Sequence, residues 1–272
     1  MDQLFTIEKI RIGSDTVRLT VNDADTETIF VIFTSDFMSL KLFEGKQVDS
    51  DTYNELKSLH YYCYAYTRCL KKLANKDLSR HELESFLDQQ MNLSDIQKKA
   101  IMDQFVSLGY IDDERLVITQ FENDQVKLIG RNKTRYSLMK RGLDEKLISE
   151  EYEKVSYGDE LARAVRKADI IARSLLAYPE KEKKARLYNK LYDSGYSREI
   201  INEAIGSLDL YDAEKEQENI QRAYSTGLRK YSVRFTGRKL YQKLYTFLAQ
   251  KGYRNEDIRE VLEKLQEEEN ED

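Results

Sequence analysis

The sequence lacks the motifs of most enzymes and has few of the residues that build turns. Its 272 residues include one proline, 11 glycines and no tryptophan. Helices tolerate that composition well, whereas turn-rich β-sandwiches normally contain more proline and glycine. No glycine-rich phosphate loop, GxSxG, HExxH or paired-cysteine motif is present. We therefore expect a mostly helical protein that is not an enzyme and has no catalytic residue, metal site or cofactor.

Histidine and cysteine, the usual metal ligands and nucleophiles, are scarce. The two histidines are His60, within an expected helix, and His81, at the start of the next, where solvent exposure or capping explains both. The two cysteines, Cys63 and Cys69, form no CxxC motif. We expect them to be reduced, partly buried thiols.

Long apolar runs are also missing. None approaches the length of a membrane span, and the amino-terminal MDQLFTIEKIRIG lacks the layout of a signal peptide. The net charge of −5 argues against a uniformly basic nucleic-acid binder, although local patches stay open. We expect a cytoplasmic protein without membrane contact.

The first fifty residues differ in pattern from the rest. Val17, Leu19 and Val21 alternate with polar residues, and residues 28–33 form a β-branched and aromatic run. A turn is expected between them at Asn22, Asp23 and Asp25. The pattern predicts a small β-rich cap over residues 1–52. A helical stripe then begins, in which apolar residues recur at three- and four-residue steps: Leu56, Leu59, Cys63, Tyr66, Leu70 and Leu73.

Internal repeats are the most informative feature of the remainder. LMKRGLDEKLI (138–148), LYDSGYSREII (191–201) and LAQKGYRNEDI (248–258) share one pattern of leucine, glycine and isoleucine. A divergent copy lies upstream, with Met91 and Asn92 where the others have glycine and a bulky residue. Each glycine is expected to end a helix in the left-handed conformation: Gly142, Gly195 and Gly252.

Aspartates follow the second helix of the predicted unit. Asp112, Asp159 and Asp212 each come four residues after its last apolar position and are expected to cap a third helix. Capping also explains the adjacent pair of Asp112 and Asp113, for which acid–base chemistry is the alternative.

The fold class that follows is mostly α, with tandem three-helix repeats in an elongated curved array behind the β-rich cap. The predicted segments are repeat 1 (53–124), repeat 2 (125–178), repeat 3 (179–232) and a partial repeat 4 (233–272). Arrays of this kind present long surfaces and usually bind a large partner.

Two windows, 125–143 and 219–255, are rich in basic residues and contain no aspartate or glutamate. Aromatic residues are interleaved in the second window. Such a pattern suits phosphate contact with stacking on unpaired bases, or equally an acidic protein surface. A solvated helix face with its aromatics turned inward is the third alternative. The predicted contact residues are Arg131, Lys133, Arg135, Lys140, Arg141, Arg229, Lys230, Arg234, Arg238 and Lys239.

Three segments together resemble the RecX regulatory family: LSRHELESFL (78–87), GYIDDERLV (109–117) and GRNKTRYSLMKRGL (130–143). The shared elements are Ser79, Arg80, Glu82 and Leu83, then Gly109, Tyr110, Asp112 and Asp113, then Leu138, Lys140, Arg141, Gly142 and Leu143. The resemblance covers roughly residues 55 to 265. The chain departs from the family pattern at 131–133, where many members have a Gly-Pro-Lys-like turn, so entry into that helix is expected to differ.

The resemblance implies a modulator of the RecA recombinase. RecX proteins lodge in the groove of the RecA–single-stranded DNA filament and limit filament extension, ATP hydrolysis, strand exchange and LexA cleavage. The ATPase belongs to RecA, so no cofactor is implied for this chain, and a monomer with weak direct DNA binding is expected. The alternative is a helical-repeat scaffold that binds proteins without nucleic-acid contact. An unrecognised enzyme would instead show a polar pocket with strongly perturbed carboxylates.

Overall fold

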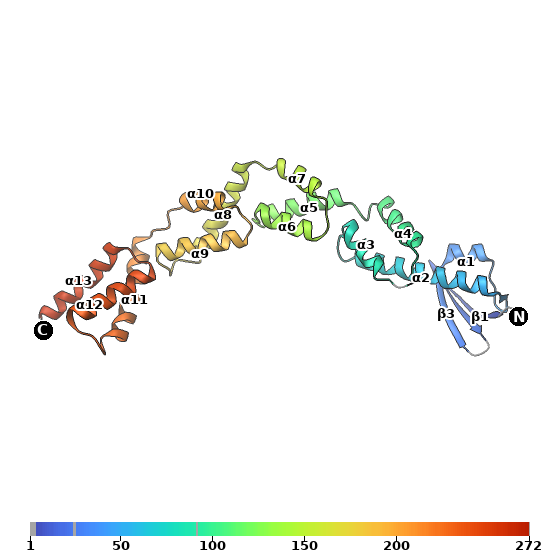
Figure 1. Cartoon of the computed structure of the whole chain (residues 1–272), viewed down its shortest axis with the longest axis horizontal. Helices are drawn as coiled ribbons and strands as arrows, with labels where there is room; N and C mark the ends of the chain where they lie inside the picture. Colours follow the sequence, from blue (N-terminus) through green and yellow to red (C-terminus); the bar gives the residue numbers. More distant parts are fainter. Residues whose placement is uncertain (1–3, 24–25, 91, 272) are drawn as a thin grey trace. The chain divides into compact units, whose positions relative to one another are not determined.

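The structure is a computed structural model that describes residues 4–23, 26–90 and 92–271, with side chains up to Glu263 apart from that of Asp23. The amino-terminal elements are β1 (Phe5–Ile12), β2 (Thr16–Asp23), β3 (Thr26–Phe33), α1 (Thr34–Leu40) and β4 (Gln47–Val48). The helices that follow are α2 (Ser50–Leu73), α3 (Arg80–Asp88), α4 (Asp95–Ser107), α5 (Asp113–Val126), α6 (Arg131–Lys140), α7 (Glu145–Glu153), α8 (Tyr157–Arg173), α9 (Glu180–Asp193), α10 (Arg198–Gly206), α11 (Ala213–Tyr231), α12 (Gly237–Lys251) and α13 (Asn255–Glu271) (Figure 1).

Two compact units divide the chain. Unit 1 comprises Met1–Val117 and Met139–Leu147, and unit 2 comprises Ile118–Leu138 and Ile148–Asp272. The predicted fold class, mostly helical with tandem three-helix units and a small β-rich cap, is confirmed.

The cap in unit 1 is an antiparallel sheet in the order β3-β2-β1-β4. Val17, Leu19 and Val21 on β2 are fully buried, as their alternation predicts, and pack with Phe30 and Leu56 into one core. The expected turn residue Asp25 lies outside the described residues. The sheet and the start of α2 therefore share a hydrophobic core.

His60 has a structural role on α2. Its Nδ1 lies 3.0 Å from the backbone nitrogen of Val31 on the edge strand β3, which suits a hydrogen bond donated by that N–H. The ring thus satisfies a backbone donor that an edge strand leaves unpaired. On the same helix Cys63 and Cys69 are buried, free thiols, and burial raises the pKa of Cys69 to about 11.

Hydrophobic clusters group the helices in trios. One cluster draws its residues from α2, α3 and α4, another from α8, α9 and α10, and another from α11, α12 and α13. This grouping places α8 and α11 at the start of a trio, whereas the predicted segments place them at the end of one. The predicted domain boundaries themselves stay a prediction.

The repeated glycines adopt the expected left-handed conformation. Gly142, Gly195 and Gly252 have φ angles of 73°, 91° and 98°. Each is also a point of close approach, which the sequence pattern did not predict. A Cβ on Gly142 would lie 2.4 Å from the His81 ring at the start of α3, and one on Gly195 would lie 2.4 Å from the Cβ of Lys133. The end of one repeat's second helix therefore packs against the start of the second helix one repeat earlier.

Hydrogen bonds at the start of α6 show how this packing works in unit 2. The N–H of Gly130 donates to the Ser194 carbonyl at 2.8 Å, and that of Asn132 donates to the Gly195 carbonyl at 2.9 Å. Free N–H groups at the start of α6 thus meet free carbonyls at the end of α9. Opposite ends of the two helix dipoles face each other, which stabilises the contact.

The capping prediction is confirmed for two aspartates and wrong for the third. Asp112 accepts a hydrogen bond from the Arg115 N–H at 2.9 Å, and Asp212 accepts one from the Lys215 N–H at 3.1 Å. At α8 the cap is Ser156, whose Oγ accepts from the Asp159 N–H at 3.1 Å. The helix begins earlier there because a serine three residues upstream offers a cap first.

Candidate nucleoprotein interface

Exposed cations gather where α11 ends and α12 begins. They form the C-terminal basic cluster, defined as Arg229, Lys230, Arg234, Arg238, Lys239 and Lys243. The connection between the two helices spans only residues 232–236, which keeps the members near one another. In the part of the chain whose side chains are described, no carboxylate forms an ion pair with any of them. The cluster is thus a patch of uncompensated positive charge.

Backbone dipoles add to this charge at α12. Its first turn has no acidic residue and carries Arg238 and Lys239, and its N-cap residue Thr236 makes no side-chain cap hydrogen bond. Cations at a helix start are unfavourable for the isolated helix, because the free N–H groups there already carry partial positive charge. An anion between these groups would relieve the repulsion.

The aromatic residues of this region support the core rather than form an open stacking platform. Tyr231 and Phe247 pack edge to face at 5.8 Å between ring centroids, and both are part of the α11–α13 hydrophobic cluster. Cations lie on the outer side of the rings: Lys230 Nζ is 5.1 Å from the Tyr231 centroid, and Lys243 Nζ is 5.6 Å from that of Phe235. The rings orient the cations, and base stacking has little support from this geometry.

Two predicted contact residues of the first window are tied into the fold. Arg131 places Nε 3.2 Å from the Glu160 carboxylate and its guanidinium 5.0 Å from the Tyr152 ring. Arg141 has a side chain only 15% exposed, which pairs with Glu82 at 2.8 Å. These arginines hold helices together.

The other residues of the first window are exposed on α6. Lys133 donates from Nζ to the Asp193 carbonyl at 3.0 Å, which fixes its stem along the end of α9. Arg135 and Lys140 present their side chains to solvent. Charge available to a partner is therefore smaller in this window than in the C-terminal basic cluster.

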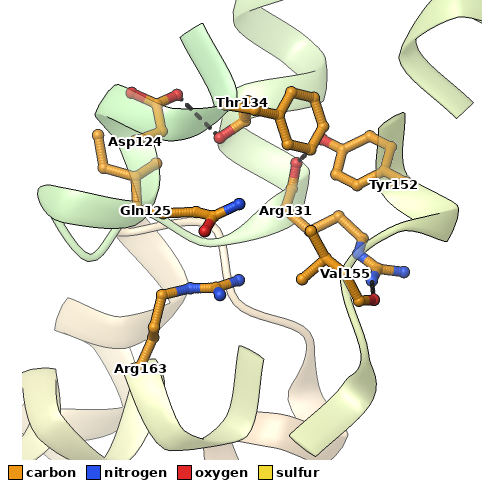
Figure 2. A pocket seen from close by; sticks show the side chains of 9 residues that line it. Asp124, Gln125, Arg131, Thr134, Tyr152, Val155 and Arg163 are labelled. Atoms are coloured by element: carbon orange, nitrogen blue, oxygen red, sulfur yellow. Dashed lines mark hydrogen bonds between the residues drawn. The ribbon is translucent and has the colours of Figure 1, made fainter. Parts of the chain in front are cut away.

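Figure 2 shows a polar cavity beside Arg131 in unit 2 that bears on the enzyme alternative. Arg163 reaches in from α8 toward Gln125, and the Thr134 hydroxyl donates to Asp124 at 2.8 Å. The cavity holds about 10 Å³, room for one water molecule and no substrate. Its carboxylate is already bonded within the fold.

Among the described residues, no group of three or more His, Cys, Asp or Glu side chains could hold a metal ion. None of the helices in the described part of the chain is both long and apolar enough to cross a membrane.

Comparison with known proteins gives one consistent result. The regulatory protein RecX of Streptococcus equi subsp. equi (strain 4047) is 25% identical over 213 residues, which cover 78% of this chain and 81% of that protein. RecX of Streptococcus uberis (strain ATCC BAA-854 / 0140J) is 23% identical over 262 residues, covering 91% of this chain and 96% of the relative. A profile described as RecX, third three-helix domain, matches residues 216–262. The chain is similar to RecX regulatory proteins over most of its length.

A solved structure shows the same fold. The crystal structure of a regulatory protein RecX superposes with a TM-score of 0.55 at 17% identity, covering 75% of this chain and 100% of that one. The profile match spans most of α11, all of α12 and the first part of α13, so the C-terminal basic cluster lies within the segment that resembles the third three-helix domain of RecX. The relatives are named as regulatory proteins rather than as enzymes.

Glu82 is expected to give a pH-dependent contribution to the stability of unit 1. Burial raises the pKa of its carboxyl, but hydrogen bonds from Arg141, Lys76 and the Ser79 N–H outweigh that effect and hold the pKa at about 2. A depressed pKa stabilises the fold above the ordinary value of 4.5, and that stabilisation is lost as the pH falls toward 2. We expect the stability difference between the wild type and Glu82→Gln to shrink over that interval. Urea titrations at pH 6, 4 and 3 measure it; a difference that stays constant would contradict the assignment.

Proposed function

We propose that this protein is a RecX-type negative regulator of RecA. It binds in the groove of the RecA filament on single-stranded DNA and inhibits filament extension, ATP hydrolysis, strand exchange and LexA cleavage. Similarity to RecX regulatory proteins supports the coarser role of RecA regulator, and the C-terminal basic cluster supports contact with a polyanionic filament. ATP hydrolysis is carried out by RecA, so this chain needs no nucleotide site of its own.

The observation that carries the proposal is the uncompensated charge of the cluster. Its cations are exposed and lack acidic partners among the described side chains, in a chain whose net charge is −5. Protein surfaces normally mix charges of both signs, and a segregated patch attracts a partner of opposite charge. DNA phosphates and the acidic surface of a nucleoprotein both supply that charge.

The geometry also reduces the set of residues that we propose to contact the partner. Arg229, Lys230, Arg234, Arg238 and Lys239 are exposed and can reach a partner, and the exposed residues Lys133, Arg135 and Lys140 on α6 are further proposed contacts. Arg131 and Arg141 are proposed to stabilise the fold instead, because their guanidinium groups already pair with the buried carboxylate of Glu160 and the partly buried carboxylate of Glu82.

The test is charge reversal at four cluster positions. The variant Arg229→Glu, Arg234→Glu, Arg238→Glu and Lys239→Glu is expected to weaken inhibition of RecA–single-stranded DNA ATP hydrolysis about tenfold, with unchanged helicity by circular dichroism. A matched control reverses exposed cations outside both windows: Arg11, Lys57, Lys99 and Arg166. If both variants inhibited RecA equally, the C-terminal basic cluster would not be part of the interface.

Salt dependence separates DNA contact from the scaffold alternative. For bare single strands, log K should fall against log salt with a slope of about −0.7 for each phosphate neutralised. The reversed variant is expected to have a shallower slope. Binding to the filament that does not change with salt would favour a protein-binding scaffold.

A further inference from the structure

A groove with an acidic and aromatic lining lies in unit 1, apart from the basic residues discussed above. It has a volume of about 510 Å³ and is formed by the β1–β2 turn, the end of β3, the first turn of α1, and the adjoining parts of α2 and α4. Its lining residues include Asp15, Thr34, Asp36, Tyr62 and Tyr66. No lysine or arginine is among the described residues that line it. The groove therefore combines negative charge with aromatic surface.

The aromatic wall is held rigidly. The Phe33 ring packs edge to face on Tyr66 at 5.4 Å and on Tyr62 at 6.2 Å. Tyr66 in turn stacks on the buried Phe105 ring at 4.7 Å. Since Phe105 belongs to the α2–α4 core, the wall keeps its shape without a ligand. A flat guest could stack on it with little ordering cost.

Some polar groups that line the groove lack an ion-pair or hydrogen-bond partner in the described part of the chain. Neither Asp36 nor Asp15 forms an ion pair within the described part of the chain. Burial raises the pKa of the Asp36 carboxyl, so the fold holds it in a partly desolvated place without a cation to compensate. The Thr34 hydroxyl, also in the lining, is buried and has no hydrogen-bond partner. Buried polar groups of this kind normally have a partner.

We propose that this groove binds an arginine side chain presented by a partner protein. The guanidinium would stack on the Tyr62 face while its N–H groups donate to the Asp36 carboxylate. This surface is independent of the C-terminal basic cluster, and it attracts a basic protein segment where the cluster attracts an anion.

Arginine fits better than lysine for two reasons. Its planar group stacks on aromatic rings and donates to a carboxylate in a fixed fork, whereas an ammonium is a compact and strongly hydrated charge. The groove, at about 510 Å³, also has room for the aliphatic stem of an arginine. A nucleic acid is disfavoured because two carboxylates line the site.

The experiment is an NMR titration of the full chain with Nα-acetyl-arginine methylamide. Saturable shifts are expected for the amides of Ser35, Asp36 and Tyr62. The neutral citrulline analogue, which has nearly the same shape, is expected to give none, and the lysine analogue is expected to bind several-fold more weakly. Equal responses to arginine and citrulline, or shifts scattered over the molecule, would overturn the proposal, and equal binding of lysine would overturn the assignment of arginine.

Variants supply the second arm. Asp36→Asn removes the charge at nearly constant volume and is expected to weaken arginine binding about tenfold. Asp193→Asn, at an exposed aspartate on α9, is the matched control and should bind as the wild type does. The spectrum of Asp36→Asn away from the groove reports that the fold is intact. Unchanged affinity in that variant would refute the site.

Discussion

Replacing Lys183 by alanine is expected to lower the free energy of unfolding by about 3–5 kcal/mol. Lys183 on α9 and Glu216 on α11 are 2% and 3% exposed, and their charged groups lie 3.1 Å apart. Alanine would leave the Glu216 carboxylate buried without its cation. Urea denaturation followed by circular dichroism at pH 7 measures the loss.

Matched variants separate the buried charge from the loss of side-chain volume. Lys184→Ala, one position along the same helix, breaks an exposed ion pair with Glu180 and is expected to cost at most about 0.5 kcal/mol. The double variant Lys183→Met with Glu216→Leu removes both charges and should recover most of the stability lost in Lys183→Ala. If the double variant were as unstable as the single one, the cost would come from packing rather than from the unpaired carboxylate.

The buried carboxylate recurs in the repeats. Glu160 and Glu216 are each the fourth residue of their helices, α8 and α11, and both are 3% exposed. Each pairs with a cation from the second helix of the preceding trio, Arg131 for Glu160 and Lys183 for Glu216. Each of these two contacts in unit 2 therefore includes an ion pair with a buried carboxylate, and in the Lys183–Glu216 pair the cation is buried as well. A pair fixes the register of the two helices, because any slip leaves two charges unsatisfied.

Local sequence signals predicted the helical repeats well because they act within a few residues. A glycine at a helix end is favoured because the residue there adopts a positive φ. Apolar residues at three- and four-residue steps indicate that one face of the helix is buried. Even the divergent first repeat follows this logic. Asn92 has a φ of 75°, and asparagine is among the non-glycine residues that enter this region most readily. Met91 lies outside the described residues.

The candidate site was predicted less completely, since charge alone does not reveal its partner. The cations of the C-terminal basic cluster lie in an acid-free stretch of sequence and form no ion pair among the described side chains, so the sequence pattern predicted their exposure. Arg131 and Arg141 also lie in an acid-free window, but their partners are 29 and 59 residues away in sequence. The aspartate-lined groove was missed for the same reason, because the β1–β2 turn, the end of β3, α1, α2 and α4 contribute to it from separate segments of the sequence.

Replacing Gly195 by alanine is expected to lower the free energy of unfolding by about 2–4 kcal/mol, through two separable effects. Its φ of 91° is strained for any residue with a Cβ. The new Cβ would also lie 2.4 Å from the Lys133 Cβ and 2.5 Å from the Lys133 nitrogen, so α6 must move away from α9. Thermal and urea denaturation of the purified variant measure the sum of both effects.

Other glycines of unit 2 isolate each effect. Gly237→Ala has a positive φ of 51° but nothing within 4 Å of the new Cβ, so it should show strain alone, about 1–2 kcal/mol. Gly130→Ala places a Cβ 2.4 Å from the Gly195 carbonyl carbon without a positive φ, so it should show the close approach alone. Gly206→Ala, in helix α10 with open space around it, should gain about 0.5–1 kcal/mol. If Gly130→Ala were as stable as the wild type, the contact between α6 and α9 would not be the reason that glycine stands at these positions, and the left-handed conformation alone would explain the repeat.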